Sequence, residues 1–309
     1  MKSYILKRFL SMLVTLWVIV TLTFFLMHSI PGSPFNEERA TSDAVQKNLE
    51  SFYHLDEPLA VQYVLYLKSI VTFDFGPSIK QPSQTVNDLL GRGFPVSFEL
   101  GMVTLILAVI SGITLGIIAA LRRNGIIDYI AMSIAVIGLS IPNFVMATLL
   151  IQQLSVNFKI LPAATWTSPL HMILPTLALA TGPMAIIARL TRSSMIEVLT
   201  QDYIRTARAK GLSPMKIVLK HALRNALMPV ITVLGTIAAS VLTGTFVIEQ
   251  VFAIPGMGKY FVDSINTRDY PVIMGTTVFY SSILIIMLFL VDIAYGILDP
   301  RIKLYKKEG

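Results

Sequence analysis

The chain has 309 residues, of which 54% are hydrophobic and only 14% are charged. Soluble domains carry about 25% charged residues, so this composition excludes an ordinary soluble protein, and the high hydrophobicity excludes a disordered one. Because the sequence contains no cysteine, disulfides, thiolate catalysis and cysteine-ligated metal sites are excluded too. The net charge of +7 is compatible with nucleic-acid binding, but the positions of the basic residues decide against it.

Long runs without charge are the main feature of the sequence. A membrane-spanning helix needs about 20 mostly apolar residues, and its backbone amides must be satisfied within the helix. We therefore predict an all-α integral membrane protein with six transmembrane helices, the first an uncleaved span. In chain order, the uncharged runs lie within residues 9–36, 100–121, 129–158, 160–188, 225–248 and 270–291.

Helix-softening residues interrupt several of these runs. The interruptions are Pro142, Pro175, Gly182-Pro183 and Pro229, and they fit a translocation pathway and ordinary kinks equally well. The GxxxG pattern from Gly112 to Gly116 permits close helix approach, and packing within one subunit is favoured over a dimer contact.

The Lys and Arg residues indicate the orientation of the spans. In the short loops they concentrate on the side of the N-terminus, within residues 1–8, 122–128 and 189–227 and in the tail from Asp299. Such an excess marks the cytoplasmic side of a membrane. We predict that both termini are cytoplasmic, and that the positive charge faces anionic membrane lipid and a protein partner, with no role for nucleic acid.

Two segments outside the spans are too long to be simple turns. The outer segment, residues 30–98, contains a helical pattern at Leu59–Val71. The inner segment, residues 189–227, predicts two short helices, the first with one apolar stripe through Ile196, Leu199, Tyr203 and Ala207.

Residues typical of helix ends separate the two inner helices. Gly211 is suited to a helix C-terminus, because it has no Cβ to oppose a left-handed backbone. Ser213 and Pro214 then predict the cap and first turn of the second helix.

No motif for chemistry is apparent. There is no GxxxxGK[ST] for a nucleotide, no HExxH and no GxSxG, and the histidines are scattered outside the middle of the spans. The acids nearest the spans, Glu99, Glu249 and Asp292, lie at the ends of runs, which favours interfacial or capping roles over ion coupling. We predict no catalytic, cofactor or metal site, and therefore neither an enzyme nor a self-powered transporter.

The inner helix pair is the most informative segment. Ala207, Ala209 and Gly211 would let the backbone of a partner protein approach, and the apolar stripe could lie in a groove of that partner. A basic amphipathic helix on anionic lipid explains the same periodicity. The residues alone leave both interpretations open.

At this segment the sequence resembles the membrane permeases of ABC importers, whose cytoplasmic signature is Glu-Ala-Ala, three residues and Gly, followed about ten residues later by Ile/Leu-Pro. Gly211 and Ala207 match the signature, whereas Arg205, Thr206 and Arg224 replace its Glu, first Ala and Pro. The variant found in peptide and nickel permeases is similar to residues 203–212 and 221–229. Further matching stretches are residues 32–34, 56–58, 61–63, 73–76, 138–144, 161–162, 249–252, 254–258 and 268–271.

This resemblance spans nearly the whole chain and is closest to the first of the two permease subunits of an oligopeptide importer. It implies the type I ABC importer permease fold in a prokaryotic cell (inner) membrane. The implied organisation is a first helix plus a long extracellular segment at 1–94, a permease core at 95–299 and a cytoplasmic tail at 300–309. The implied partners are a second homologous permease subunit, two cytoplasmic ABC ATPase subunits, and a lipid-anchored or periplasmic peptide-binding protein.

The implied function is half of a translocation pathway, driven by ATP hydrolysed on the partner ATPases. Dipeptides or nickel are alternative cargoes, and a passive channel or a membrane anchor is the alternative of another class. The ATPase-coupling residues implied by the resemblance are Tyr203, Arg205, Thr206, Ala207, Arg208, Ala209, Lys210, Gly211 and Leu212.

Overall fold

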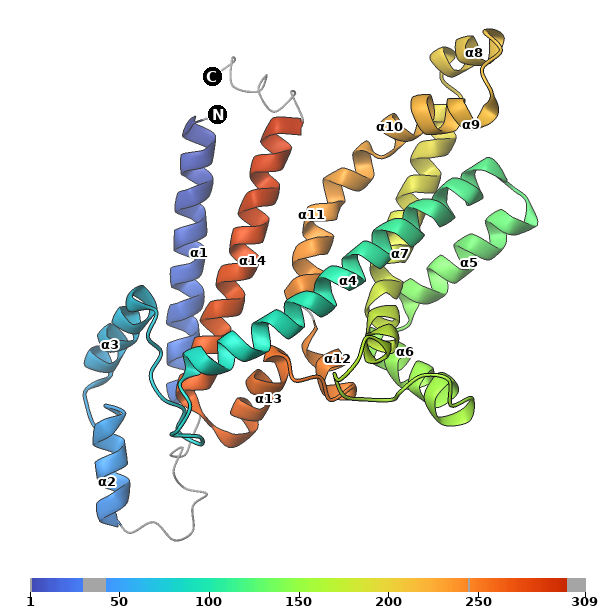
Figure 1. Ribbon diagram of the computed structural model, residues 1–309. Coiled ribbons are helices and arrows are strands. Elements are labelled where there is room, and N and C mark those ends of the chain that lie inside the picture. Colours follow the sequence, from blue (N-terminus) through green and yellow to red (C-terminus); the bar gives the residue numbers. More distant parts are fainter. Residues whose placement is uncertain (1, 30–42, 244, 299–309) are drawn as a thin grey trace. The chain divides into compact units, whose positions relative to one another are not determined.

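The computed structural model describes residues 2–29, 43–243 and 245–298, and it is built from helices (Figure 1). Among the described residues, the only β-type pairing is an isolated bridge between Pro77 and Thr85. The predicted tail at 300–309 lies outside the described residues. In chain order the helices are α1 (Lys2–Ser29), α2 (Asp43–Phe52), α3 (Leu59–Thr72), α4 (Val86–Leu121), α5 (Ile126–Ser140), α6 (Asn143–Leu150), the π-helix η1 (Ile151–Asn157), α7 (Leu170–Leu199), α8 (Asp202–Ala209), α9 (Pro214–Lys216), the π-helix η2 (Ile217–Ala222), α10 (Leu223–Ala226), α11 (Met228–Thr243), α12 (Phe246–Val251), α13 (Met257–Thr267) and α14 (Tyr270–Leu298).

Five helical segments of the described chain are long and apolar enough to cross a membrane, and a bent helix pair makes a sixth if it counts as one span. The number equals the predicted six only when the bent pair is counted as the third span, which is not one continuous helix. The pair α5 and α6–η1 is bent by 109°. Pro142 causes the break, because proline disfavours a helical backbone at the residue before it, and Ile141 is extended with φ −89° and ψ 122°.

Two boundaries differ from the sequence-based prediction. α4 begins at Val86, so its first turns come from the segment that we predicted to be an outer loop. α7 continues to Leu199, well past Arg189, so the predicted first inner helix is instead the end of α7 followed by the short α8. The charged residues do not end α7, because Arg192 has a buried partner, described below.

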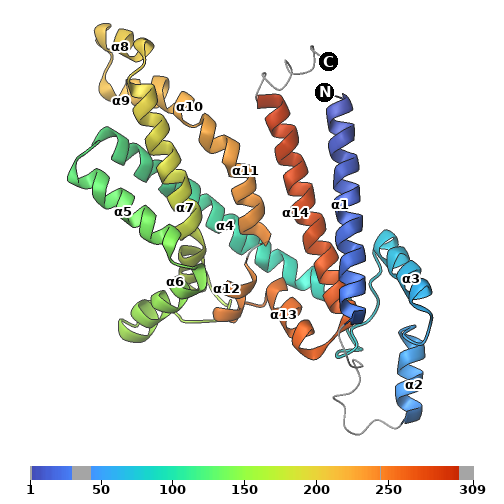
Figure 2. The same ribbon diagram turned by 180° about the vertical axis from the view of Figure 1, so that it is seen from behind.

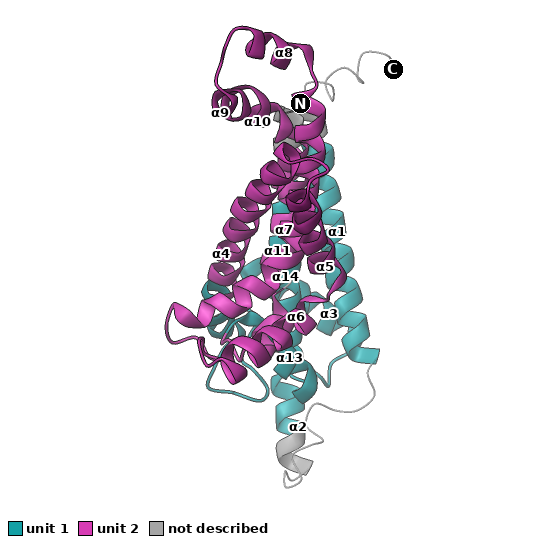
Figure 3. Cartoon of the chain, turned by 90° about the vertical axis from the view of Figure 1, so that its right-hand side faces the viewer, with its two compact units in different colours: residues 1–96, 256–289 teal, residues 97–255, 290–309 magenta. Residues whose placement is uncertain are grey.

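The described residues pack as two compact units, one within residues 1–96 and 256–289 and the other within residues 97–255 and 290–309 (Figure 3). In the first unit, α3 lies against α1, where the Thr21 and Tyr63 hydroxyls are 2.7 Å apart and the ring of Phe24 stacks on Tyr66 at 5.7 Å. α1 and α14 also run side by side in Figures 1 and 2, with Phe9 against Phe289. The predicted helix at Leu59–Val71 is confirmed as α3.

Asp269 organises the other part of this unit. It lies just before α14, and its buried carboxylate accepts hydrogen bonds from the Ser78 hydroxyl and from the backbone N–H groups of Ile79 and Lys80, the last two at 3.2 Å. Burial, and to a smaller extent the Asp269 charge, raise the pKa of Tyr53, whose hydroxyl donates to the Ser78 carbonyl. One acid therefore fixes the loop between α3 and α4 onto the start of α14.

In the second unit, α4, α5 and α11 pack around α7. Gly112 and Gly116 of α4 lie directly on α7. A Cβ at Gly116 would meet the Thr191 Cβ at 2.5 Å and the Ala188 carbonyl oxygen at 2.6 Å. The GxxxG pattern thus serves packing within the subunit, as the sequence analysis favoured.

Candidate coupling site

The turn between α8 and α9 is the part of the candidate site that the sequence defines best. Gly211 has φ +73°, in the left-handed region that glycine favours. Its N–H donates to the Arg208 carbonyl at 2.9 Å, and the Leu212 N–H donates to the Ala207 carbonyl at 3.3 Å, which is the Schellman pattern of a helix end. The predicted role of Gly211 as a helix terminator is confirmed. A Cβ at Gly211 would have no neighbour within 4 Å, so the backbone angle and not crowding selects glycine.

The second helix starts where the sequence indicates, with Pro214 in its first turn and Ser213 at the cap position. The Ser213 side chain makes no capping hydrogen bond, contrary to the usual role of serine there. The helix then widens into the π-helix η2 and returns to α-helix at Leu223. We call α8, α9, η2 and α10 together the coupling hairpin.

The inner face of the coupling hairpin is apolar and closed. Ile204 and Ala207 of α8 are 0% and 6% exposed, and they pack with Ile217, Val218 and Ala222 of η2. Ala207 was expected to let the backbone of a partner protein approach. Its side chain instead lies inside the chain's own core, so it supports a contact surface from beneath.

The outer face of α8 and its turn is polar and cationic. Tyr203 is 43% exposed, and its hydroxyl accepts a hydrogen bond from the Asn225 side chain at 2.8 Å, which links the two arms of the coupling hairpin. Arg205 makes only an exposed ion pair with Asp202 at 3.4 Å, which contributes little energy. The exposed members of the predicted set are Tyr203, Arg205, Thr206, Arg208, Ala209, Lys210 and Gly211, while Leu212 is partly buried.

The coupling hairpin is anchored to the ends of two long helices. Its core cluster includes Ala120 from the last turns of α4 and Met195 from the last turns of α7, both buried. The coupling hairpin therefore cannot move without displacing these helix ends. Figure 1 shows this arrangement, with α8 and α9 beyond the end of α7.

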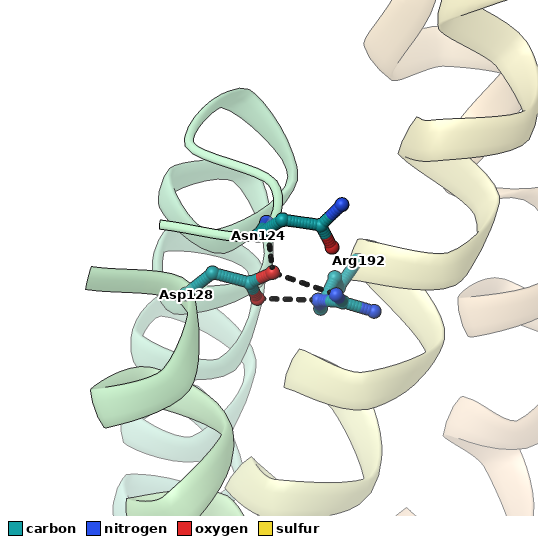
Figure 4. Close-up of polar contacts among 3 residues, drawn as sticks. All are labelled: Asn124, Asp128 and Arg192. Carbon is teal, nitrogen blue, oxygen red and sulfur yellow. Dashed lines mark hydrogen bonds and ion pairs between the residues drawn. The ribbon is translucent and has the colours of Figure 1, made fainter. Parts of the chain in front are cut away.

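The sequence analysis missed an ion pair beside this anchor, between a buried acid and an arginine whose side chain is 27% exposed. Asp128, in the first turn of α5, is 2% exposed and accepts two hydrogen bonds from Arg192 of α7, at 2.5 Å from Nε and 2.7 Å from Nη2 (Figure 4). The Asn124 N–H donates to the same carboxylate at 2.9 Å. Asp128 bounded a predicted run and Arg192 lay within the predicted inner segment, and nothing in one sequence showed that they meet.

Glu249 also departs from the expectation of an interfacial or capping acid. It is fully buried in α12, where its carboxylate accepts the Thr245 hydroxyl at 2.5 Å. No group of three or more His, Cys, Asp or Glu side chains in the described part of the chain could hold a metal ion.

Comparison with known proteins decides the family. Residues 112–304 match the model of the binding-protein-dependent transport system inner membrane component, and residues 1–96 match the N-terminal membrane component of such systems. The chain belongs to this family. It is 76% identical to the dipeptide transport system permease protein DppB of Bacillus subtilis (strain 168), over 99% of this chain and 100% of that protein. It is 47% identical to the oligopeptide transport system permease protein OppB of Haemophilus influenzae, over 98% and 100%.

Solved structures confirm the predicted fold of this family member. The MetNI methionine ABC transporter in an inward-facing conformation matches with a TM-score of 0.55 and 21% identity, over 68% of this chain and 94% of that one. An amino acid ABC transporter crystallised with histidines matches with a TM-score of 0.54 and 16% identity, over 69% and 95%. The fold is therefore the type I ABC importer permease fold.

Proposed function

We propose that the chain is a permease subunit of an ATP-driven, binding-protein-dependent peptide importer in a prokaryotic cell membrane. It supplies half of the translocation pathway, a second homologous permease supplies the other half, and two cytoplasmic ABC ATPase subunits power the cycle. A lipid-anchored or periplasmic binding protein delivers the peptide. The permease itself is not an enzyme. The observation that carries the proposal is the full-length similarity to permeases named for peptide transport.

The coupling hairpin is the proposed contact with the ATPase. Its exposed face presents Arg205, Arg208 and Lys210 beside the small residue Ala209. Acidic groups in a groove of the ATPase would pair with these cations, while the flanking basic residues also suit anionic lipid. Ala207 holds the face in place from inside the coupling hairpin. The organisation into 1–94, 95–299 and 300–309 stays part of this proposal.

The proposed mechanism is mechanical. ATP closes the ATPase dimer, the coupling hairpin moves with its groove, and the spans change from inward-facing to outward-facing. A ligand shifts such an equilibrium only if it binds the two states differently. The loaded binding protein must therefore dock more tightly to one state.

The cargo is the finer part of the proposal. Peptides are the proposed class, and dipeptides come first because the relative at 76% identity is named for them. Oligopeptides come second, since the relative at 47% identity is named for those. The decisive assay reconstitutes the complete complex in liposomes and measures ATP hydrolysis with binding protein loaded with a dipeptide, a longer peptide or nickel. Stimulation by a peptide supports the proposal, and uptake by the permease alone, without ATPases, contradicts it in favour of a channel.

The turn residue gives a sharper test of the coupling hairpin. Gly211→Glu strains the positive φ and adds negative charge to a cationic face. A loss of about 1.4 kcal/mol in the free energy of ATPase binding corresponds to a tenfold weaker contact. We therefore expect ATPase binding and peptide uptake to fall by about tenfold or more. Gly211→Asn is the matched control, because asparagine tolerates this backbone region and adds no charge. Peptide uptake by Gly211→Glu at the parental rate, at normal membrane level, removes the coupling assignment.

A further inference from the structure

One face of α5 presents small residues and a single acid to the protein interior. The buried residues of α5 are Asp128, Ala131, Ala135 and Gly138, and their spacing places them on one side of the helix. α5 packs against α7. At the far end of this face, a Cβ on Gly138 would lie 3.1 Å from the Thr181 carbonyl oxygen, so the two helix backbones approach closely there.

Such a face brings two helices close but does not fix how far one slides along the other. Large side chains lock a helix pair by interdigitating, and alanine and glycine have too little side chain to do so. Asp128 and Arg192 provide what the small residues lack. Their two-point contact through Nε and Nη2 has a defined direction as well as charge (Figure 4). The Asn124 N–H holds the same carboxylate from the α5 side.

The ion pair lies where α7 meets three other elements. Thr191, the neighbour of Arg192, lies against Gly116 of α4. Met195, one turn further, packs in the core of the coupling hairpin together with Ala120. Residues 191–195 of α7 therefore contact α4, α5 and the coupling hairpin. That apolar core includes residues of α4, α7 and the coupling hairpin but none of α5.

We propose that Asp128 and Arg192 are positioning residues that set the register of α5 on α7 and thereby transmit movement of the coupling hairpin to the bent third span. The inference rests on the proposed function. When an ATPase displaces the coupling hairpin, the apolar core carries α7 and α4 with it. The ion pair fixes the position of α5 along α7, so α5 moves with α7. The far end of α5 leads directly into the bend at Pro142.

A role in register differs from a role in stability. Replacing a buried ion pair by well-packed hydrophobic residues of similar volume is often neutral or stabilising, whereas fixing register is the best-attested use of buried polar or ionic groups. The double variant Asp128→Asn/Arg192→Gln removes the pair without leaving an unpaired buried charge. Arg192→Lys keeps the charge but loses the two-point geometry of the guanidinium.

The first measurement is the number of peptides transported per ATP hydrolysed in the reconstituted complex. For the double variant and for Arg192→Lys, we expect ATPase subunits to bind and ATP to be hydrolysed at rates within about twofold of the parent, while transport per ATP falls about fivefold or more, the usual scale of a coupling energy. Where the double variant does not accumulate in the membrane, Arg192→Lys carries the test alone.

The second measurement reports the register itself. The chain contains no cysteine, so Gly138→Cys/Thr181→Cys gives a cross-link without background. An added Cβ at position 138 lies 3.5 Å from the Thr181 Cβ, within disulfide range. Removing the ion pair should lower this yield and raise that of Gly138→Cys/Ala185→Cys, one turn further along α7.

Parental values in either measurement overturn the inference. If the variants transport as many peptides per ATP as the parent, the pair has no role in coupling. If they give the same cross-linking yields as the parent, the pair has no role in setting the register. The cross-link requires no ATPase, so it judges the register even if the proposed function is wrong. If the parent complex shows no peptide-stimulated ATP hydrolysis, the proposed function fails and not the register.

Discussion

Gly116 illustrates how single residues set the close helix contacts of the second unit. A Cβ there would meet the Thr191 Cβ and the Ala188 carbonyl of α7, and neither is the flexible end of a side chain. We expect Gly116→Ala to destabilise the detergent-solubilised protein by about 1–3 kcal/mol, the cost of overpacking. Thermal unfolding followed by circular dichroism measures this.

Gly91, in the same helix α4, is the matched control for this prediction. An added Cβ there would have no neighbour within 4 Å. Gly91→Ala should therefore leave stability unchanged or raise it by about 0.4–1 kcal/mol. Equal effects of the two substitutions would show that the α4–α7 contact is looser than described.

What the sequence predicts at the residue scale depends on whether the cause is local. The role of Gly211 follows from its own backbone angle and could be predicted. The burial of Ala207 and Glu249 depends on elements that pack on them, so it could not. Asp128 and Arg192 lie 64 positions apart, and only the packing of α5 on α7 brings them together.

At the scale of elements, the coupling hairpin has a closed inner face and an exposed outer face on the same short helix. Ala207→Leu should overpack the inner face against Ile217 and Val218, at a cost of about 1–3 kcal/mol. The coupling hairpin should then open, and trypsin should cleave the permease faster at Arg208 and Lys210. Limited proteolysis of the purified permease without ATPases measures this.

Ala209→Leu is the matched control, since Ala209 is exposed on the same helix. It should leave the trypsin pattern of the permease unchanged. In the complete complex it should nevertheless weaken ATPase binding, because the larger leucine side chain would prevent the close approach of the ATPase at the proposed contact face. If Ala209→Leu opened the coupling hairpin as much as Ala207→Leu, the assignment of inner and outer faces would be wrong.

The limits of sequence-based prediction for elements are physical. Hydrophobic length predicts a crossing, and the third run is long enough for one. Pro142 marks where its helix breaks, but the 109° bend follows from how α5 and α6 each pack on α7. In contrast, Pro175 and Pro183 lie inside α7 without ending it. Proline therefore locates candidate breaks, and tertiary packing decides which ones occur.

At the scale of the whole molecule, the number of crossings depends on whether the bent pair passes through the membrane or returns to its starting side. Five segments of the described chain are long enough by themselves, and only a crossing by α5 and α6–η1 gives six. Six crossings keep both termini on one side, as we predict from the distribution of Lys and Arg. A re-entrant pair would place the termini on opposite sides.

The absence of cysteine makes this question directly testable with single-cysteine variants and a membrane-impermeant maleimide. Arg122, Ser83 and Lys159 are all exposed side chains in turns or loops. We expect Ser83→Cys and Lys159→Cys to be labelled on intact cells, and Arg122→Cys only after permeabilisation. Labelling of Lys159→Cys only after permeabilisation would make the bent pair re-entrant. Because residues 189–227 would then lie outside the cell, that result would also separate the coupling hairpin from any cytoplasmic ATPase.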